Sequence, residues 1–344
     1  MTTQTATPPD IAAQLQRLFA PIAGDLNATE SRLRDELSHQ KPFIDELAQH
    51  SFRMSGKRLR PALLLLTAAA SGKVTGEHTT LAAVVEMVHT ATLVHDDVLD
   101  EADVRRHTDT VNARWSNQTS VLLGDYLFTH AFYLASTLET PHGCRTIGHA
   151  TNRVCEGELL QTASAGNFDI SREEYLHIID AKTAALCACA CELGAFYAGA
   201  NEKTVTQYRD YGSDLGIAFQ IADDLLDLIG DESDVGKSLG TDLAHCKMTL
   251  PLINLRDQCS PADRTELERL CTTPTPENLA TIQAWLSDSG EIAAARRIAV
   301  EYAERAADRI RSLKPESSDN GSARRFQAHQ SLMALAEFVI ARNA

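Results

Sequence analysis

The chain has 344 residues, a formal net charge of −15, and 44% hydrophobic against only 6% aromatic residues. The acidic balance argues against a nucleic-acid partner, because no broad basic field is present to neutralise phosphates. The aliphatic, aromatic-poor composition favours a core of packed helices over an aromatic-rich β-sandwich. A protein of this charge that binds phosphates must concentrate its basic residues locally.

The eight cysteines show neither a metal-site nor a disulfide spacing. Cys187, Cys189 and Cys191 alternate in an alanine-rich stretch, and a helix would spread them around its axis. We interpret them as small apolar core residues in a reducing compartment. The N-terminus lacks a secretion signal, and no stretch reaches the roughly 18 uninterrupted apolar residues of a spanning helix. The sequence therefore predicts a soluble, cytoplasmic protein without a transmembrane segment.

Apolar residues recur at three- and four-residue steps along the chain, beginning with Ile11, Leu15 and Leu18. Strand signals are scarce, because no alternating Val/Ile/Thr runs are bounded by Asn-Gly or Asp-Gly turns. The long helical segments are expected at 81–100, 121–138 and 207–229, and the breaks at 71–76, 140–143, 165–171, 230–240 and 271–276. A charged, serine-rich loop at 311–324 precedes a last amphipathic helix. With no clear linker, we expect one all-α domain over residues 1–344, of about a dozen helices, with residues 1–12 disordered.

Two distant segments resemble each other and end in the same acidic pattern. Residues 91–100 read ATLVHDDVLD, and residues 218–227 read AFQIADDLLD. On a helix the first and last aspartates of each pattern share one face, and like charges at that spacing destabilise a helix near its negative C-terminal end. A counter-ion resolves the conflict, and hard carboxylate oxygens without nearby cysteine favour Mg²⁺. The six carboxylates are Asp96, Asp97, Asp100, Asp223, Asp224 and Asp227.

Basic residues cluster close to these motifs in the sequence. GKRLRP occupies residues 56–61, Arg105 and Arg106 follow the first motif, and Lys237 and Lys247 follow the second. Each cluster alone reads as solvated surface charge, but arginine forks and lysine charges suit diphosphate oxygens. His89 lies about two helical turns before Asp96 on nearly the same face, which favours a ligand role over a core role.

These features together resemble the trans-isoprenyl diphosphate synthase family, also called the polyprenyl synthetases. The motifs that carry the resemblance are GKRLRP, HTATLVHDDVLDEADVRR (89–106), Lys182-Thr183 and FQIADDLLD followed by GKSLGTDL. The resemblance is strong from about Lys41 to Leu255. It implies an isoprenoid synthase-type bundle of mostly antiparallel helices around a central cavity, usually in a homodimer. The two Asp-rich helices are expected to face each other across that cavity.

The resemblance also implies roles for individual residues. Asp96, Asp100 and Asp223 are expected to ligate three Mg²⁺ ions on an allylic diphosphate, with Asp97, Asp224 and Asp227 supporting them directly or through water. Arg105, Lys182 and Lys237 are expected to contact the same diphosphate, and Lys57, Arg60, His89 and Arg106 to bind isopentenyl diphosphate. Thr183 and Gln220 complete the implied catalytic set, and Lys247 closes over the leaving group. One departure is HCKMTL at 245–250, where many relatives carry Gly-Lys-Pro-Thr, which puts the shape of this loop in doubt.

Product length is predicted from the turns that precede Asp96. Short-chain members of the family place an aromatic floor four or five residues before the motif, where this chain has Thr92 and Ala91. The deeper turns add only Val88, Val85 and Val84, which also leave the channel open, so the next candidate floor is the aromatic face Phe128–Phe132 on a facing helix. We therefore expect a long product, from hexaprenyl to decaprenyl with octaprenyl favoured, as in synthases that make quinone side chains. Farnesyl or a shorter diphosphate is the expected primer.

Three other readings remain open at this stage. A short-chain farnesyl or geranylgeranyl diphosphate synthase shares every motif. A terpene cyclase shares the fold, but usually has an Asn/Ser/Glu-type second metal motif and does not need GKRLRP. A non-catalytic subunit of a two-component synthase tends to lose one or both acidic motifs, and both are intact here.

Overall fold

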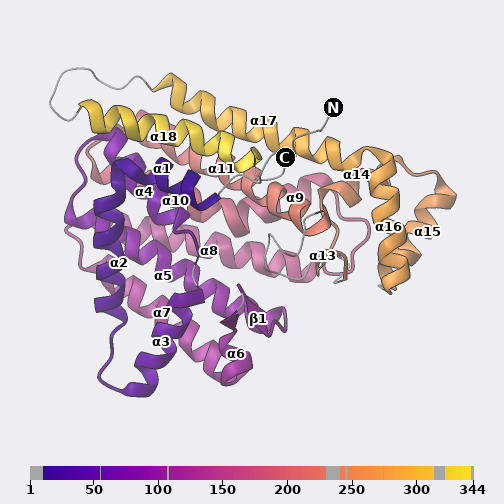
Figure 1. The fold of residues 1–344 in the computed structure, drawn as a ribbon, viewed down its shortest axis with the longest axis horizontal. Helices are drawn as coiled ribbons and strands as arrows, with labels where there is room; N and C mark the ends of the chain where they lie inside the picture. The colour runs from indigo at the N-terminus through magenta and orange to yellow at the C-terminus, as the bar shows by residue number, and fades with distance from the viewer. Residues whose placement is uncertain are drawn as a thin grey trace, which may run out of the picture.

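The computed structural model describes residues 11–54, 56–106, 108–229, 241–244, 247–273, 275–313 and 322–341. Helices dominate this part of the chain, which confirms the all-α expectation (Figure 1). The N-terminal half contains α1 (Ile11–Phe19), η1 (Ala20–Ile22), α2 (Ala23–Leu37), α3 (Pro42–Met54), α4 (Leu59–Ser71), α5 (Gly76–Leu99), α6 (Val111–Arg114), α7 (Asn117–Ser136) and α8 (His142–Ala163). The C-terminal half contains α9 (Arg172–Ile179), η2 (Asp180–Ala184), α10 (Ala185–Tyr197), α11 (Glu202–Ile229), α13 (Thr241–Ala244), α14 (Leu250–Gln258), α15 (Pro261–Thr272), α16 (Pro276–Ser289), α17 (Glu291–Ser312) and α18 (Ser322–Ala341).

Local signals in the sequence place many of the helix ends. Ser116 begins α7 by accepting a hydrogen bond from the Thr119 amide, and Ser171 forms a capping box with Glu174 at the start of α9. Gly290, at φ +80°, ends α16 in the left-handed conformation that favours glycine. The breaks expected at 71–76, 140–143, 165–171 and 271–276 coincide with the ends of observed helices, and the one expected at 230–240 lies outside the described residues.

The only strands in the described residues form a short hairpin that the sequence did not reveal. β1 (Val104–Arg105) pairs antiparallel with β2 (Thr108–Asp109), and Arg105 lies opposite Thr108. With two residues on each side, the pairing is too short to produce an alternating pattern. The hairpin follows α5 directly, so it carries the Arg105–Arg106 pair next to the first acidic motif.

The core is built around α11, which packs against α10 on one side and α17 on the other. Helix α10 packs in turn on α4, and α5 packs along α7. In Figure 1, α17 and α18 run along one side of the bundle, and α15 and α16 lie together at one end. Every residue of α4 from Pro61 to Ala70 is buried, as its unbroken run of small and aliphatic side chains requires. Tyr211 is also fully buried, and its hydroxyl donates to the Leu332 carbonyl at 2.7 Å, joining α11 to α18.

Cys187, Cys189 and Cys191 are buried in α10, which agrees with their interpretation as core residues. Burial raises the pKa of Cys187 and Cys189 above the ordinary thiol value. Across the described ranges, no helix combines the length and apolar character needed to cross a membrane.

A buried carboxylate ties α11 to α17. The side chain of Asp214 is only 4% exposed and accepts from Arg305 Nη2 at 2.5 Å and from Arg309 Nε at 2.6 Å. Arg309 Nη1 also reaches Asp210 at 3.2 Å. This network lies on the face of α11 that contacts α17.

Glycine allows the helices to approach closely at α10. A Cβ added to Gly194 would lie 2.3 Å from the Leu64 carbonyl oxygen of α4. We expect Gly194→Ala to lower the free energy of unfolding by about 3 kcal/mol, because the obstacle is backbone that cannot rotate away. Gly24→Ala in α2 meets nothing within 4 Å and should instead stabilise the fold by about 0.5 kcal/mol. Urea unfolding of both variants tests this, and equal effects would contradict the packing described.

Candidate active site

Two interactions bring the acidic motif of α5 close to that of α11. The charge of Lys182, on η2, acts on Asp96, and the hydroxyl of the adjacent Thr183 donates to Gln220 Oε1 on α11 at 2.7 Å. Arg106, which follows α5, interacts electrostatically with Asp223 on α11. Among the described residues, Asp96, Asp223, Lys182 and Arg106 of the predicted sites therefore come together around η2 and the β1–β2 hairpin.

In the first motif the three carboxylates have different surroundings. Asp97 is buried and accepts a hydrogen bond from Arg105 Nε at 2.7 Å. Asp96 is partly exposed and Asp100 is exposed at the C-terminal end of α5, where its amide donates to the Asp96 carbonyl at 2.8 Å. Asp96 and Asp100 are thus accessible to a cation, and Asp97 fixes the arginine beside them.

The second motif shows the same division. Asp224 is buried and accepts from the Tyr175 hydroxyl at 2.6 Å and from Gln220 Nε2 at 2.8 Å. Burial raises the pKa of Asp224 to about 6, and the Lys247 ammonium opposes that rise. Asp223 is partly exposed. Asp227 Oδ2 accepts from the Asp242 amide at 3.0 Å, which ties α13 to the end of α11.

Lys247 joins this second group from the segment after α13. Its ammonium donates to Asp242 Oδ1 at 3.0 Å and lies 4.0 Å from Asp224 Oδ1. The pKa of Lys247 is raised, because attraction to Asp224 and Asp242 outweighs the cost of burial. The lysine therefore stays protonated at the edge of the acidic site.

Asp96 faces a mixed field of charges. Burial raises the pKa of its carboxyl to about 7, Lys182 opposes the rise, and Glu158 and Asp100 add to it. Lys182 Nζ donates to Glu158 Oε1 on α8 at 2.7 Å. The protein alone therefore does not stabilise the negative charge of Asp96 fully. A bound divalent cation would stabilise it.

The turn that carries Lys182 and Thr183 has an unusual backbone. Residues Asp180–Ala184 form a π-helical turn between α9 and α10, a feature frequent at functional sites. The Asp180 carboxylate accepts from Arg153 Nη2 at 2.5 Å and from the Ser213 hydroxyl at 3.0 Å. A Cβ on Gly157 would lie 2.6 Å from the Lys182 amide nitrogen, so α8 contacts this turn backbone to backbone. These contacts fix the position of the turn that carries Lys182 and Thr183.

Four basic residues act on His89, which lies about two turns before Asp96 on α5. Burial lowers the pKa of His89 well below its ordinary value, and the charges of four arginines lower it further. These arginines are Arg58, Arg60, Arg105 and Arg106. The imidazole is thus neutral within a concentrated positive field, which suits binding of a polyanion.

The hairpin that holds two of these arginines is fastened at its base. The buried Thr110 hydroxyl donates to the Ala102 carbonyl at 2.7 Å, and Asn112 Nδ2 donates to the same oxygen at 3.0 Å. His50 Nε2 lies 2.7 Å from the Asp109 carbonyl oxygen. Arg106 has φ +51°, a conformation rare for non-glycine residues and concentrated at functional sites.

Gly56 marks where the GKRLRP turn meets this hairpin. A Cβ at Gly56 would lie 2.2 Å from Arg106 Nη1. In Gly56→Ala the flexible guanidinium should move aside at little cost to stability, but away from the position in which the family resemblance expects it to contact isopentenyl diphosphate. We expect the KM for isopentenyl diphosphate to rise about tenfold, with little change for Gly76→Ala, which meets nothing within 4 Å. Steady-state kinetics of both variants checks this, and an unchanged KM in Gly56→Ala would refute it.

The donor set fits Mg²⁺ shared with a substrate. Within the described ranges, no three His, Cys, Asp or Glu side chains converge as a metal cluster. Mg²⁺ does not need such a cage, because it usually binds one or two carboxylates together with substrate phosphates and water. Asp96, Asp100 and Asp223 are accessible carboxylates of this kind, and Lys182 and Arg105 lie beside them.

The residues predicted to set product length occupy different environments. Val88 and Ala91 are fully buried, whereas Thr92 is partly exposed on the face of α5 that also carries Asp96. Phe132 on α7 is partly buried and approaches Gly148 on α8. The Thr92 hydroxyl donates to the His89 carbonyl at 2.8 Å.

Some predicted positions cannot be placed, and some residues at the site were missed. Lys237, within 230–240, and the His245-Cys246 pair lie outside the described residues. Glu158, Tyr175 and Arg58 were missed because their partners are distant in sequence, and Asp242 was missed although its partner Lys247 lies only five residues away. The basic run GKRLRP marks the region as a binding site, but it does not distinguish the role of Arg58 from those of Lys57 and Arg60.

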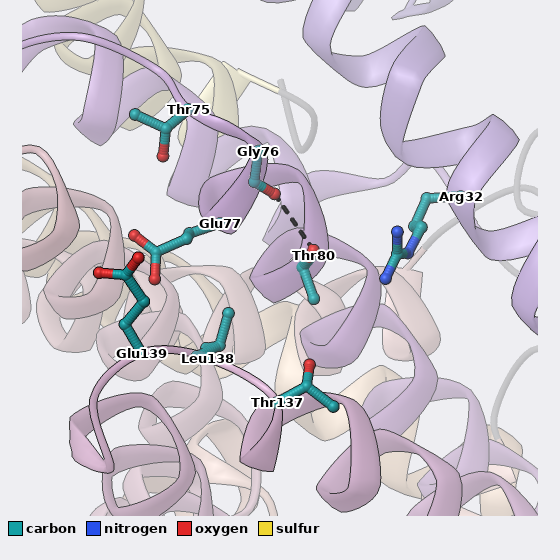
Figure 2. Close-up of a pocket in the computed structure, with 8 residues that line it drawn as sticks. All are labelled: Arg32, Thr75, Gly76, Glu77, Thr80, Thr137, Leu138 and Glu139. Atoms are coloured by element: carbon teal, nitrogen blue, oxygen red, sulfur yellow. Dashed lines mark hydrogen bonds between the residues drawn. The ribbon is translucent and has the colours of Figure 1, made fainter.

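A separate hollow of about 450 Å³ lies at the start of α5 (Figure 2). Glu77 and Glu139 extend toward each other on one side of it, and Arg32 lies on the other. Its lining includes none of the six motif aspartates, and its two carboxylates disfavour a diphosphate. This hollow is not the active site.

The sequence of the chain is similar to those of known proteins. The sequence model described as "Polyprenyl synthetase" matches residues 41–288. The chain is 37% identical over 304 residues to an all-trans-nonaprenyl-diphosphate synthase (geranyl-diphosphate specific) of Rhodobacter capsulatus, covering 88% of this chain and 93% of that one. It is 36% identical over 259 residues to octaprenyl diphosphate synthase of Escherichia coli, covering 74% and 80%.

A solved structure agrees in fold over nearly the whole chain. Polyprenyl synthase from Caulobacter crescentus, complexed with calcium and isoprenyl diphosphate, superposes with a TM-score of 0.88 at 33% identity, covering 96% of this chain and 98% of that one. The match extends well beyond the motifs, because it includes the helices on both sides of the acidic site. The chain therefore belongs to the polyprenyl synthetase family, a family of prenyltransferases.

Proposed function

We propose that this protein is a magnesium-dependent all-trans-polyprenyl diphosphate synthase with a long product, octaprenyl within a range from hexaprenyl to decaprenyl. It adds isopentenyl diphosphate head-to-tail to an allylic diphosphate. The observation that carries the proposal is the placement of two accessible acidic pairs and two separate basic groups around one site. The acidic site with Lys182 and Arg105 takes the allylic diphosphate, and the group around His89, with Lys57, Arg60 and Arg106, takes isopentenyl diphosphate.

Asp96 and Asp100 on α5 and Asp223 on α11 are the residues that hold Mg²⁺, with three ions when substrate is bound. Asp227 assists them directly or through water. Asp97 and Asp224 are the buried members, and their contacts with Arg105 and with Tyr175 and Gln220 support a positioning role. Bound Mg²⁺ supplies Lewis-acid charge that stabilises the departing diphosphate.

The basic side chains add to that stabilisation. Lys182, Arg105 and Lys237 bind the allylic diphosphate, and Lys247 closes over the leaving group. As the carbon–oxygen bond breaks, negative charge grows on the diphosphate and positive charge on the allylic carbons. Lysine and arginine side chains that are already in place stabilise the negative charge on the diphosphate without having to reorganise. Such preorganisation is the usual source of electrostatic catalysis.

Thr183 and Gln220 lie where the positive charge develops. Thr183 donates to Gln220 Oε1 and Gln220 Nε2 donates to Asp224, so the amide is held in one orientation. Lys57, Arg60, His89 and Arg106 hold isopentenyl diphosphate with its double bond toward the allylic carbon. That double bond attacks, and the departed diphosphate takes the final proton, so no protein nucleophile is needed.

A long product is favoured by the small side chains before Asp96. Thr92, on the same face as Asp96, is the first residue that a growing chain meets on α5, and neither it nor Ala91 provides an aromatic floor. Phe132 is the candidate floor farther along.

We also propose a single catalytic domain that acts as a homodimer. Tyr302 packs against both buried clusters of the core, which supports one folding unit. Leu122 and Tyr133 of α7 and Leu159 of α8 are 61%, 62% and 70% exposed, an apolar surface that a second copy would cover. Light scattering on the purified protein tests the dimer, and a monomer at micromolar concentration would rule it out.

The function is tested by incubating the purified protein with farnesyl diphosphate, isopentenyl diphosphate and Mg²⁺. Chromatography of the products should show chains of hexaprenyl to decaprenyl length. Mainly C20 material would indicate a short-chain synthase, a cyclised hydrocarbon would indicate a terpene cyclase, and unreacted C15 primer alone would indicate a non-catalytic subunit.

A further inference from the structure

Arg58, the first of the two arginines of GKRLRP, contacts three other helices of the protein. Its Nε donates to Glu30 Oε1 at 2.5 Å, and its Nη1 donates to Glu86 Oε1 at 2.7 Å. The guanidinium carbon lies 4.1 Å from the centre of the Phe52 ring. The side chain is 16% exposed. It therefore joins α2, α3 and α5 at the point where α4 begins.

The backbone at Arg58 is held in an unfavourable conformation. Its dihedral angles are φ 54° and ψ 35°, the left-handed region that non-glycine residues rarely adopt. Its carbonyl accepts the first hydrogen bond of α4, from the Ala62 amide at 3.0 Å. A strained conformation persists only where surrounding contacts impose it, and the contacts of the Arg58 side chain do so here.

Glu86 is the fixed end of this arrangement. It is buried on α5, one turn before His89, and its side chain is 2% exposed. Its charge also raises the pKa of Arg58 and acts on Arg106, so it lies beneath the basic field. The buried negative charge of Glu86 offsets the electrostatic repulsion between the neighbouring arginines.

We infer that Arg58 is a positioning residue: clamped between Glu30 and Glu86, it sets the left-handed turn that directs Lys57 and Arg60 toward the diphosphate of the homoallylic substrate. The inference rests on the proposed function for the identity of that substrate. The role assigned to Arg58 is one of positioning, because its Nε, its Nη1 and one face of its guanidinium are occupied by the protein.

The test separates positioning from simple structural support. Arg58→Met leaves Glu86 buried without its partner and should destabilise the fold. The double variant Arg58→Met/Glu86→Gln removes both charges and should regain most of the melting temperature. If the contacts of Arg58 set the turn, the double variant should still bind isopentenyl diphosphate about tenfold more weakly than the wild type. Without Arg58, Lys57 and Arg60 are no longer held in the position that binds the diphosphate.

Arg58→Lys separates geometry from charge. Lysine keeps the positive charge but cannot bridge two carboxylates as a fork, so its Kd should also rise several-fold. Arg309→Met, which breaks the Asp214 network between α11 and α17, is the matched control. It should lower the melting temperature without changing ligand affinity.

Calorimetry with isopentenyl diphosphate and with inorganic pyrophosphate measures each Kd, and turnover of the wild-type chain is measured in parallel. A weakened Kd in Arg58→Lys and in the double variant, with Arg309→Met unchanged, supports the clamp. A wild-type Kd in Arg58→Lys, or recovery of the Kd together with stability in the double variant, overturns it. A wild-type chain that binds both ligands without turnover refutes the proposed function instead, and one that binds neither overturns both.

Discussion

Asp96→Asn is expected to lower kcat about 10³-fold while leaving the protein folded. Asparagine keeps the size of the side chain but loses the charge that we propose holds a metal ion at the leaving group. Since burial raises the pKa of Asp96 to about 7, the charged form is unfavourable in the fold. Its removal should therefore hold the melting temperature constant or raise it by a few degrees.

The matched control for this prediction is Asp288→Asn, at an exposed aspartate of α16. It changes the net charge equally and should leave kcat unchanged. Asp223→Asn, in the second acidic motif on α11, should lower kcat by a similar factor to Asp96→Asn. Steady-state kinetics with thermal melts distinguishes the outcomes, and an Asp96→Asn enzyme with more than a tenth of wild-type kcat would contradict the assignment.

Thr92→Phe is expected to shorten the main product from octaprenyl to C20 or below. The side chain is partly exposed on the face of α5 that carries Asp96, so a phenyl ring there enters the path of the growing chain. Ala91 is fully buried, and Ala91→Phe should shorten the product as well, at a cost of about 1–3 kcal/mol from overpacking.

Thr92→Val is the control for product length, because it removes the hydrogen bond to the His89 carbonyl but keeps the side-chain volume. Its product should match the wild type. Chromatography of dephosphorylated products resolves each length. A wild-type distribution in both phenylalanine variants would mean that the chain grows along another face of α5.

Much of the architecture could be predicted because its signals are local. The expected break at 165–171 is the observed gap between α8 and α9, and the acidic motifs fall at the ends of α5 and α11 as expected. Periodicity and capping act over a few residues, so a single sequence carries them. The β1–β2 hairpin was missed because two residues per strand leave no pattern.

The site was predicted less completely, since its contacts join distant parts of the chain. Glu30 and Glu86 each lie 28 residues from Arg58, on opposite sides in sequence, and nothing local pairs them. The π-helical turn at Asp180–Ala184 reads in sequence as ordinary alanine-rich helix. Its first residue, Asp180, accepts hydrogen bonds from Arg153 and Ser213, and these tertiary contacts have no signal in the periodicity.

The different roles of neighbouring aspartates are a further case. The sequence places Asp96 and Asp97 in one predicted metal site, because both belong to the motif. Asp97 is buried against Arg105, whereas Asp96 remains accessible. Which carboxylate meets the metal depends on the rotation of α5 against its neighbours, and that rotation is set by packing.

The claim on which this account depends is that divalent cations held by the two acidic motifs drive departure of the diphosphate. Incorporation of isopentenyl diphosphate by EDTA-treated protein, followed as Mg²⁺ is added back, tests it most directly. The account predicts no incorporation before Mg²⁺ is added, and full recovery with Mg²⁺ in the wild-type chain but not in Asp96→Asn. Undiminished incorporation in EDTA, or equal recovery in both proteins, would contradict it.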